Sequence, residues 1–166
     1  MRWEKSFGFI IVMMLSSAVV ADGKNFVTTR VLTADSATKV AVEAELACRK
    51  GGYKVSVAVV DRQGNLLAFV RNPLSGNHTI KVSQRKAYTS ATLLGATIDL
   101  VEEAKFLKDG PGILLLGGGV PIQVGGHIYG AVGVSGAPRD KIPGDVDDKC
   151  ARAGIDAVIE ALEFAE

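Results

Sequence analysis

The segment Gly112–Pro138, GILLLGGGVPIQVGGHIYGAVGVSGAP, carries the clearest indications of the fold. Ile113–Leu116 has the length and composition of a buried strand. Three glycines follow, and apolar residues then alternate with other residues over positions 120–124, which predicts a half-covered strand. Because Pro121 has no backbone N–H, this second strand is expected at a sheet edge or at a bulge.

The pair Gly125-Gly126 predicts a tight hairpin turn into a third strand. One face of that strand is apolar, and the opposite face consists mostly of very small residues: Tyr129, Ala131, Gly133 and Ser135. Such a bare face allows a helix, a second subunit or a flat ligand to lie almost on the backbone.

The flanking sequence predicts the remaining elements. Apolar residues recur at helical spacing after Thr33, after Thr79 and after Asp145, and strands are predicted over 53–60 and 66–70. The order is therefore helix, hairpin, helices, three-stranded meander, helix. This order indicates an α+β fold with a mainly antiparallel sheet of about five strands and helices packed on it.

The N-terminal residues 1–21 have the features of a secretory signal peptide. Arg2 and Lys5 form a basic start, an apolar run follows, and Val19-Val20-Ala21 is typical of a cleavage site. A membrane anchor is the alternative, but a span needs roughly 20 apolar residues. We therefore expect a single domain over 22–166 that is periplasmic or secreted, without stable membrane insertion after cleavage.

The charge balance argues against a polyanionic partner. The chain has 19 basic and 18 acidic residues, and the leader contains two of the former and one of the latter. A neutral mature chain offers no electrostatic basis for binding nucleic acid.

Two cysteines, Cys48 and Cys150, each fall on the predicted buried stripe of a helix. Their separation excludes a CxxC motif. If both helices pack on one face of the sheet, export to an oxidising compartment favours a Cys48–Cys150 disulfide. The alternative is two small buried thiols.

The motif GGGVPIQVGGHIYGAVGVSGAP resembles the signature of the GlcG/HbpS family, which also occurs as the C-terminal domain of PduO proteins. Three other stretches agree: VSVAVVDRQGNLLAFVR at 55–71, the pair Lys86-Ala87, and GDVDDKCARAGIDAV at 144–158. The resemblance implies a profilin-like antiparallel sheet with helices, haem binding in several members, and homo-oligomers. It implies no settled enzymatic activity.

A haem site is therefore sought among residues able to bind a carboxylate or an iron. His78 precedes a predicted helix N-terminus, which attracts anions such as a propionate, and Arg71, Arg85 and Lys86 are near in sequence. All three methionines lie in the leader, so His78 is the expected iron ligand, with Tyr88 behind it. The alternative for His78 is a solvated loop histidine.

Gly119 and Pro121 complete the expected cofactor-binding set, because the glycine turn allows close approach of a ligand. His127, beside the hairpin turn, is expected to be exposed. No catalytic motif is complete: there is no GxxxxGK[ST] loop, and Ala137 replaces the last glycine of GxSxG.

Three functions remain open at this point. The first is an exported haem carrier or sensor, the second an enzyme or carrier for a small carboxylate or corrinoid, and the third a regulatory partner of a membrane sensor. A homo-oligomer is expected in each case.

Overall fold

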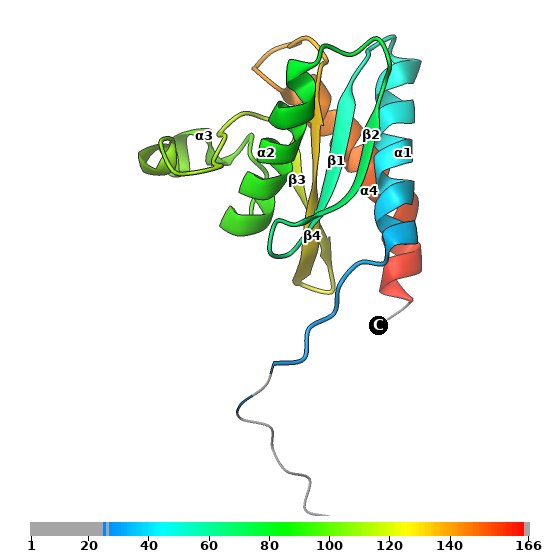
Figure 1. The fold of residues 1–166 in the computed structure, drawn as a ribbon, viewed down its shortest axis with the longest axis vertical. Coiled ribbons are helices and arrows are strands. Elements are labelled where there is room, and N and C mark those ends of the chain that lie inside the picture. Colours follow the sequence, from blue (N-terminus) through cyan, green and yellow to red (C-terminus); the bar gives the residue numbers. More distant parts are fainter. Residues whose placement is uncertain (1–24, 26, 165–166) are drawn as a thin grey trace, which may run out of the picture.

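The computed structural model describes residue 25 and residues 27–164. It contains one four-stranded sheet in the order β2-β1-β4-β3, and every neighbouring pair is antiparallel. Figure 1 shows helices on both faces of this sheet. The elements are α1 (Ala34–Lys50), β1 (Ser56–Asp61), β2 (Leu66–Arg71), α2 (His78–Leu93), α3 (Leu100–Glu103), the 3₁₀ helix η1 (Lys105–Leu107), β3 (Gly119–Val124), β4 (His127–Ser135) and α4 (Asp145–Glu163).

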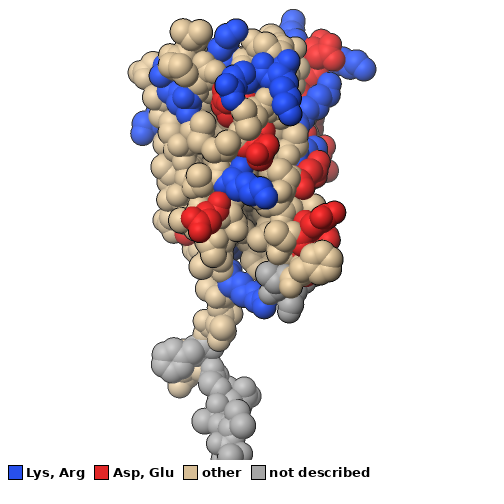
Figure 2. All heavy atoms as spheres, turned by 90° about the vertical axis from the view of Figure 1, so that its right-hand side faces the viewer, with Lys and Arg blue, Asp and Glu red and all other residues tan. Residues whose placement is uncertain are grey.

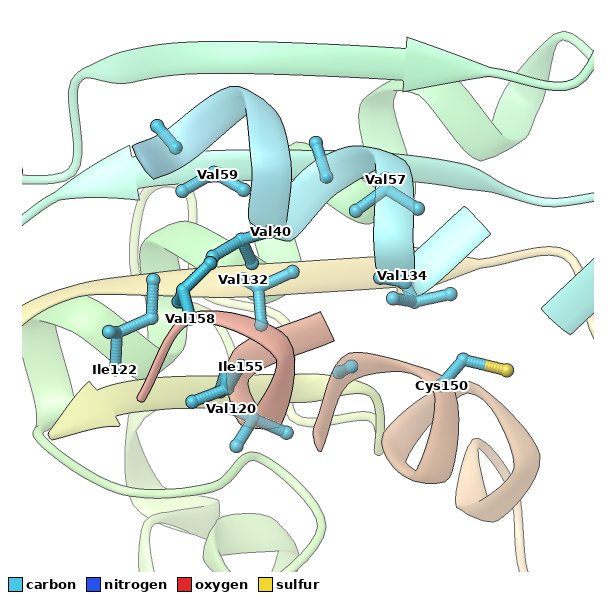
Figure 3. Close-up of a cluster of buried hydrophobic side chains, with 14 of the residues drawn as sticks. Val40, Val57, Val59, Val120, Ile122, Val132, Val134, Cys150, Ile155 and Val158 are labelled. Carbon is cyan, nitrogen blue, oxygen red and sulfur yellow. The ribbon is translucent and has the colours of Figure 1, made fainter. Parts of the chain in front are cut away.

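The main hydrophobic core lies between the sheet and the pair α1 and α4. Inward valines of β1 and β4 meet small residues of the two helices, and Figure 3 shows these side chains converging from both layers. Gly154 of α4 faces the backbone of Val40, and a Cβ there would lie 2.6 Å from the Val40 oxygen. A small-residue contact of this kind lets the two helices pack closely.

The opposite face of the sheet is covered by α2. A Cβ on Gly133 would overlap the backbone oxygen of Ser83 and lie 2.5 Å from the Ala87 nitrogen. The bare face predicted for β4 is therefore occupied by a helix of the same chain. A small second core forms here from Ala58, Val60, Ala87, Ala91 and Ala131, with Phe69 packed at its margin.

About five strands were expected and the sheet has four, because Ile113–Leu116 is irregular in the structure. Side chains of α2 and of the following loop bind its backbone instead of a neighbouring strand. The Leu114 N–H donates to Thr89 Oγ1 at 2.8 Å, and the Leu116 carbonyl accepts from Thr97 Oγ1 at 2.8 Å. The rest of the α+β prediction is confirmed.

The prediction for Pro121 is also confirmed, because β3 is an edge strand with an irregular register between Ile122 and Gln123. The β3–β4 turn is formed by Gly125 and Gly126, both with positive φ (54° and 82°), which glycine adopts at little cost.

A disulfide joins Cys48 of α1 to Cys150 of α4, with the two Cα atoms 5.4 Å apart. The predicted pairing is confirmed, and it links the two helices of the main core over 102 residues of sequence.

The signal peptide assigned to residues 1–21 lies outside the described residues and stays a prediction. Within the part of the chain that the structure describes, no helix is long and apolar enough to cross a membrane.

Candidate functional site

A shallow cavity of about 280 Å³ lies beside α2, at the margin of the sheet face that this helix covers. We call it the Tyr88 groove. Helix α2 lies over β4, β1 and β3, which leaves the edge strand β2 at the margin. The groove opens at this margin and is lined by Val60, Gly64, Leu66, Gln84, Arg85, Tyr88 and Gly112.

The Tyr88 ring is held between two glycines. A Cβ on Gly64 would lie 2.6 Å from the ring, and one on Gly112 would lie 3.0 Å from its opposite side. The β1–β2 hairpin and the loop before β3 thus lie on two sides of the Tyr88 ring. They can approach it closely because each has a glycine, without a side chain, at the point of contact.

Arg85 fastens that loop to α2. Its Nη2 donates to the Ile113 carbonyl at 2.6 Å, and its Nε points to the Gly112 carbonyl at 3.5 Å. A guanidinium has five N–H donors, so donors remain for a carboxylate in the groove. Arg85 is exposed and Leu66 is half-exposed, so the groove is open to a ligand.

His78 and Arg71 lie at the other end of α2. His78 is the first residue of the helix and is exposed. Arg71 donates to the Ser75 carbonyl, and Ser75 belongs to a buried hydroxyl cluster in which Thr79 lies 2.7 Å from both Ser75 and Ser56. Since His78 precedes Tyr88 by ten residues, the rise of an α-helix separates the two by about 15 Å.

Lys86 is placed in the interior and does not line the groove. Its side chain is 1% exposed, and Nζ donates to Asp147 Oδ2 at 2.8 Å and to the Val134 carbonyl at 2.9 Å. Burial lowers the pKa of Lys86 and raises the pKa of Asp147, because each charge loses hydration, while their mutual attraction opposes both shifts.

Asp147 and its neighbour Asp145 both bind backbone groups near the start of α4. Asp147 accepts from the Ala137 N–H at 3.0 Å. Asp145 accepts from the N–H groups of Asp140 and Lys141, and these hydrogen bonds lower its pKa to about 2. Asp145 thus holds the loop that precedes α4, whereas Asp147 is mainly the partner of Lys86.

Gly119 and Pro121 do not meet the groove either. A Cβ on Gly119 would overlap the Lys86 carbonyl, so this glycine allows β3 to lie against the backbone of α2. Pro121 lines a separate cavity of about 400 Å³ along the free edge of β3, next to α4.

The structure therefore brings together two of the predicted site residues, Arg85 and Tyr88. The groove residues Val60, Leu66 and Gln84 were not identified from the sequence, because apolar strand positions and a glutamine within a helix carry no chemical signature. Among the described residues, no group of three or more His, Cys, Asp or Glu side chains is arranged to hold a metal ion.

Comparison with known proteins agrees with this architecture. A family model described as haem degrading protein HbpS-like matches residues 32–156. Protein GlcG of Escherichia coli K12 is 33% identical over 112 residues, which cover 65% of this chain and 84% of GlcG.

Two solved structures share the fold. The crystal structure of a double mutant of Streptomyces reticuli HbpS is 38% identical, has a TM-score of 0.75, and covers 86% of this chain and 97% of its own. The PduOC–haem complex has a TM-score of 0.67 at 21% identity, covering 77% of this chain and 95% of its own. The family match over most of the chain shows that the chain belongs to the HbpS-like family.

Proposed function

We propose that this protein is an exported haem-binding protein and that haem lies in the Tyr88 groove. The observation that carries the proposal is the lining of the groove, where a tyrosine, a cation and apolar side chains meet at one open site. The description of the family as haem-degrading and the PduOC–haem complex support the choice of ligand. The signal peptide predicted at residues 1–21 supports export.

The residues present fit the parts of a haem. Val60 and Leu66 offer apolar contact to the ring, and the free donors of Arg85 suit a propionate. Tyrosine is a known type of axial ligand, and Tyr88 lines the groove itself. Bound haem would supply redox and ligand-binding chemistry at its iron.

One chain covers only part of a flat cofactor. The groove volume of about 280 Å³ is just below the range of ordinary ligand pockets, roughly 300–1,000 Å³. The exposed face of the haem is then available to a second copy of the chain, in keeping with the expected homo-oligomer.

The test is a haemin titration of the purified protein, followed by the Soret band. We expect saturable binding, a changed spectrum in Tyr88→Phe, and weaker binding without a new spectrum in Arg85→Gln. Lys81→Gln is the matched control for Arg85→Gln, because Lys81 is an exposed cation on the same helix.

The His78→Ala variant tests the position of the haem site separately from haem binding itself. Because His78 lies about 15 Å along α2 from Tyr88, haem in the groove should keep its spectrum in His78→Ala. A spectrum altered by His78→Ala and unaltered by Tyr88→Phe would discard the groove and keep haem binding. Absence of saturable binding by the wild type would remove the function.

A second candidate function is haem degradation, which the family description favours. A carrier or sensor keeps the Soret band when ascorbate is added in air, whereas a degrading enzyme loses it with release of iron. The roles of membrane-sensor partner and of carboxylate or corrinoid carrier stay predictions from the sequence.

A further inference from the structure

A second cavity, distinct from the Tyr88 groove, lies over the disulfide. Its volume is about 390 Å³. We call it the Cys150 basin, and it is lined by Ala47, Tyr53, Pro138, Arg139, Asp140, Val146, Lys149 and Cys150.

The two sulfurs of the disulfide are not equivalent toward this basin. Cys150 lines it and is 6% exposed, whereas Cys48 is fully buried in the main core. Figure 3 shows Cys150 at the margin of the core cluster, with its sulfur directed away from the labelled valines. Of the two bonded cysteines, Cys150 alone lines the basin, so a reagent in the basin approaches the disulfide from the Cys150 side.

The lining of the basin carries two cations, Arg139 and Lys149, and one acid, Asp140, which lies 3.7 Å from Lys149 Nζ; the flanking segments add further cations. Within 47–54 and 138–150, Asp140 is the single exposed acidic residue. The other acidic residues of these two segments, Asp145, Asp147 and Asp148, are buried and engaged with backbone N–H groups, Lys86 and Arg152 respectively. Figure 2 shows Lys and Arg gathered at the upper end of this face. The exposed basic residues of the two segments are Arg49, Lys50, Lys54, Arg139, Lys141 and Lys149.

We propose that the Cys150 basin is a thiol–disulfide exchange site for small anionic thiols. Positive charge around the basin concentrates an anionic thiol and favours its thiolate, which is the attacking form. The wall contributed by Tyr53, Pro138 and Val146 accommodates an apolar stem next to the sulfur.

The exchange takes place in two steps. The incoming thiolate bonds to Cys150 Sγ, the Cys48–Cys150 bond breaks, and its electron pair leaves with Cys48 Sγ, which takes up a proton. A second thiolate of the same class attacks the small-molecule sulfur of this mixed disulfide and releases Cys150 as a thiolate. Two small thiols are oxidised to their disulfide, and the protein is reduced by two electrons.

The test compares two thiols of similar size and different charge, 2-mercaptoethanesulfonate and 2-mercaptoethanol, on the oxidised protein under native conditions. At low ionic strength we expect the anionic thiol to react about three- to tenfold faster per thiolate, as electrostatic steering allows. Raising the salt concentration should remove most of this preference. After an acid quench, mass spectrometry should find the mixed disulfide on Cys150.

Arg139→Gln/Lys149→Gln should abolish most of the preference for the anionic thiol. Lys39→Gln/Lys81→Gln carries the same change in net charge on exposed positions elsewhere and should keep it. Equal rates for the two thiols, a mixed disulfide on Cys48, or reduction only as fast as global unfolding would each overturn the proposal.

Discussion

Arg85 and Lys86 are adjacent cations in the sequence, yet they have unrelated surroundings in the fold. Successive residues of an α-helix point about 100° apart, so Arg85 reaches the groove and Lys86 enters the interior. The sequence suggested that both could bind an anion, and nothing in it identified Asp147, 61 residues later, as the partner of Lys86.

We expect the Lys86–Asp147 pair to be the most sensitive polar contact of the fold. Lys86→Met leaves the Asp147 carboxylate buried without its cation, so the free energy of unfolding should fall by about 3–5 kcal/mol. Asp147→Leu should have a similar effect, and Lys86→Met/Asp147→Leu should cost much less than the two single changes together.

Urea denaturation measures this double-mutant cycle. The control is Lys105→Gln, which removes an exposed ion pair with Glu102 and should change the stability by less than about 1 kcal/mol. Additive effects of the two single changes at Lys86 and Asp147 would show that the pair is not coupled.

At the scale of elements, the contact between α2 and β4 rests on glycine. Gly133→Ala places a methyl group against the Ser83 carbonyl and the Ala87 N–H, both of which are rigid backbone. Overpacking of this kind typically costs 1–3 kcal/mol, and we expect a loss of about 3 kcal/mol or more. Gly126→Ala is the comparison, because that glycine has open space and only a positive φ (82°), so about 1 kcal/mol is expected.

Chemical denaturation of both variants measures the two losses of stability. If Gly133→Ala is no more destabilising than Gly126→Ala, then α2 can move away from β4, and the close packing is not a constraint on the fold.

The sequence predicts elements well where local chemistry decides them. Gly125-Gly126, Pro121 and the Cys48–Cys150 pair each allow few backbone or packing arrangements, and all three predictions are confirmed. Ile113–Leu116 was predicted wrongly because an apolar run suits a strand or an irregular segment equally, and hydrogen bonds from distant side chains such as Thr89 decide between them. The groove is harder to predict from the sequence, because it forms only where the β1–β2 hairpin, α2 and the loop before β3 come together in the fold.

At the scale of the whole molecule, one edge of the sheet is left with apolar side chains. Strand β2 has the sequence LLAFVR; Leu66 is exposed, and the four apolar residues after it are half-buried against the two cores. A free edge is ordinarily protected by charge, proline or a covering element, and β2 has only Arg71, at its end. An unprotected apolar edge of this kind fits association with a second copy.

We therefore expect the protein to be at least a dimer at micromolar concentration, and we expect β2 to contribute to the interface. Light scattering coupled to gel filtration should give a multiple of the chain mass. Leu66→Lys should shift the equilibrium toward the monomer without unfolding the chain, because Leu66 is 49% exposed and the lysine head can remain in water. Leu74→Lys, at a 76% exposed position beyond the end of β2, should leave the mass unchanged. A wild-type mass of one chain across this range of concentration would exclude the dimer, and equal behaviour of the two variants would place the interface away from β2.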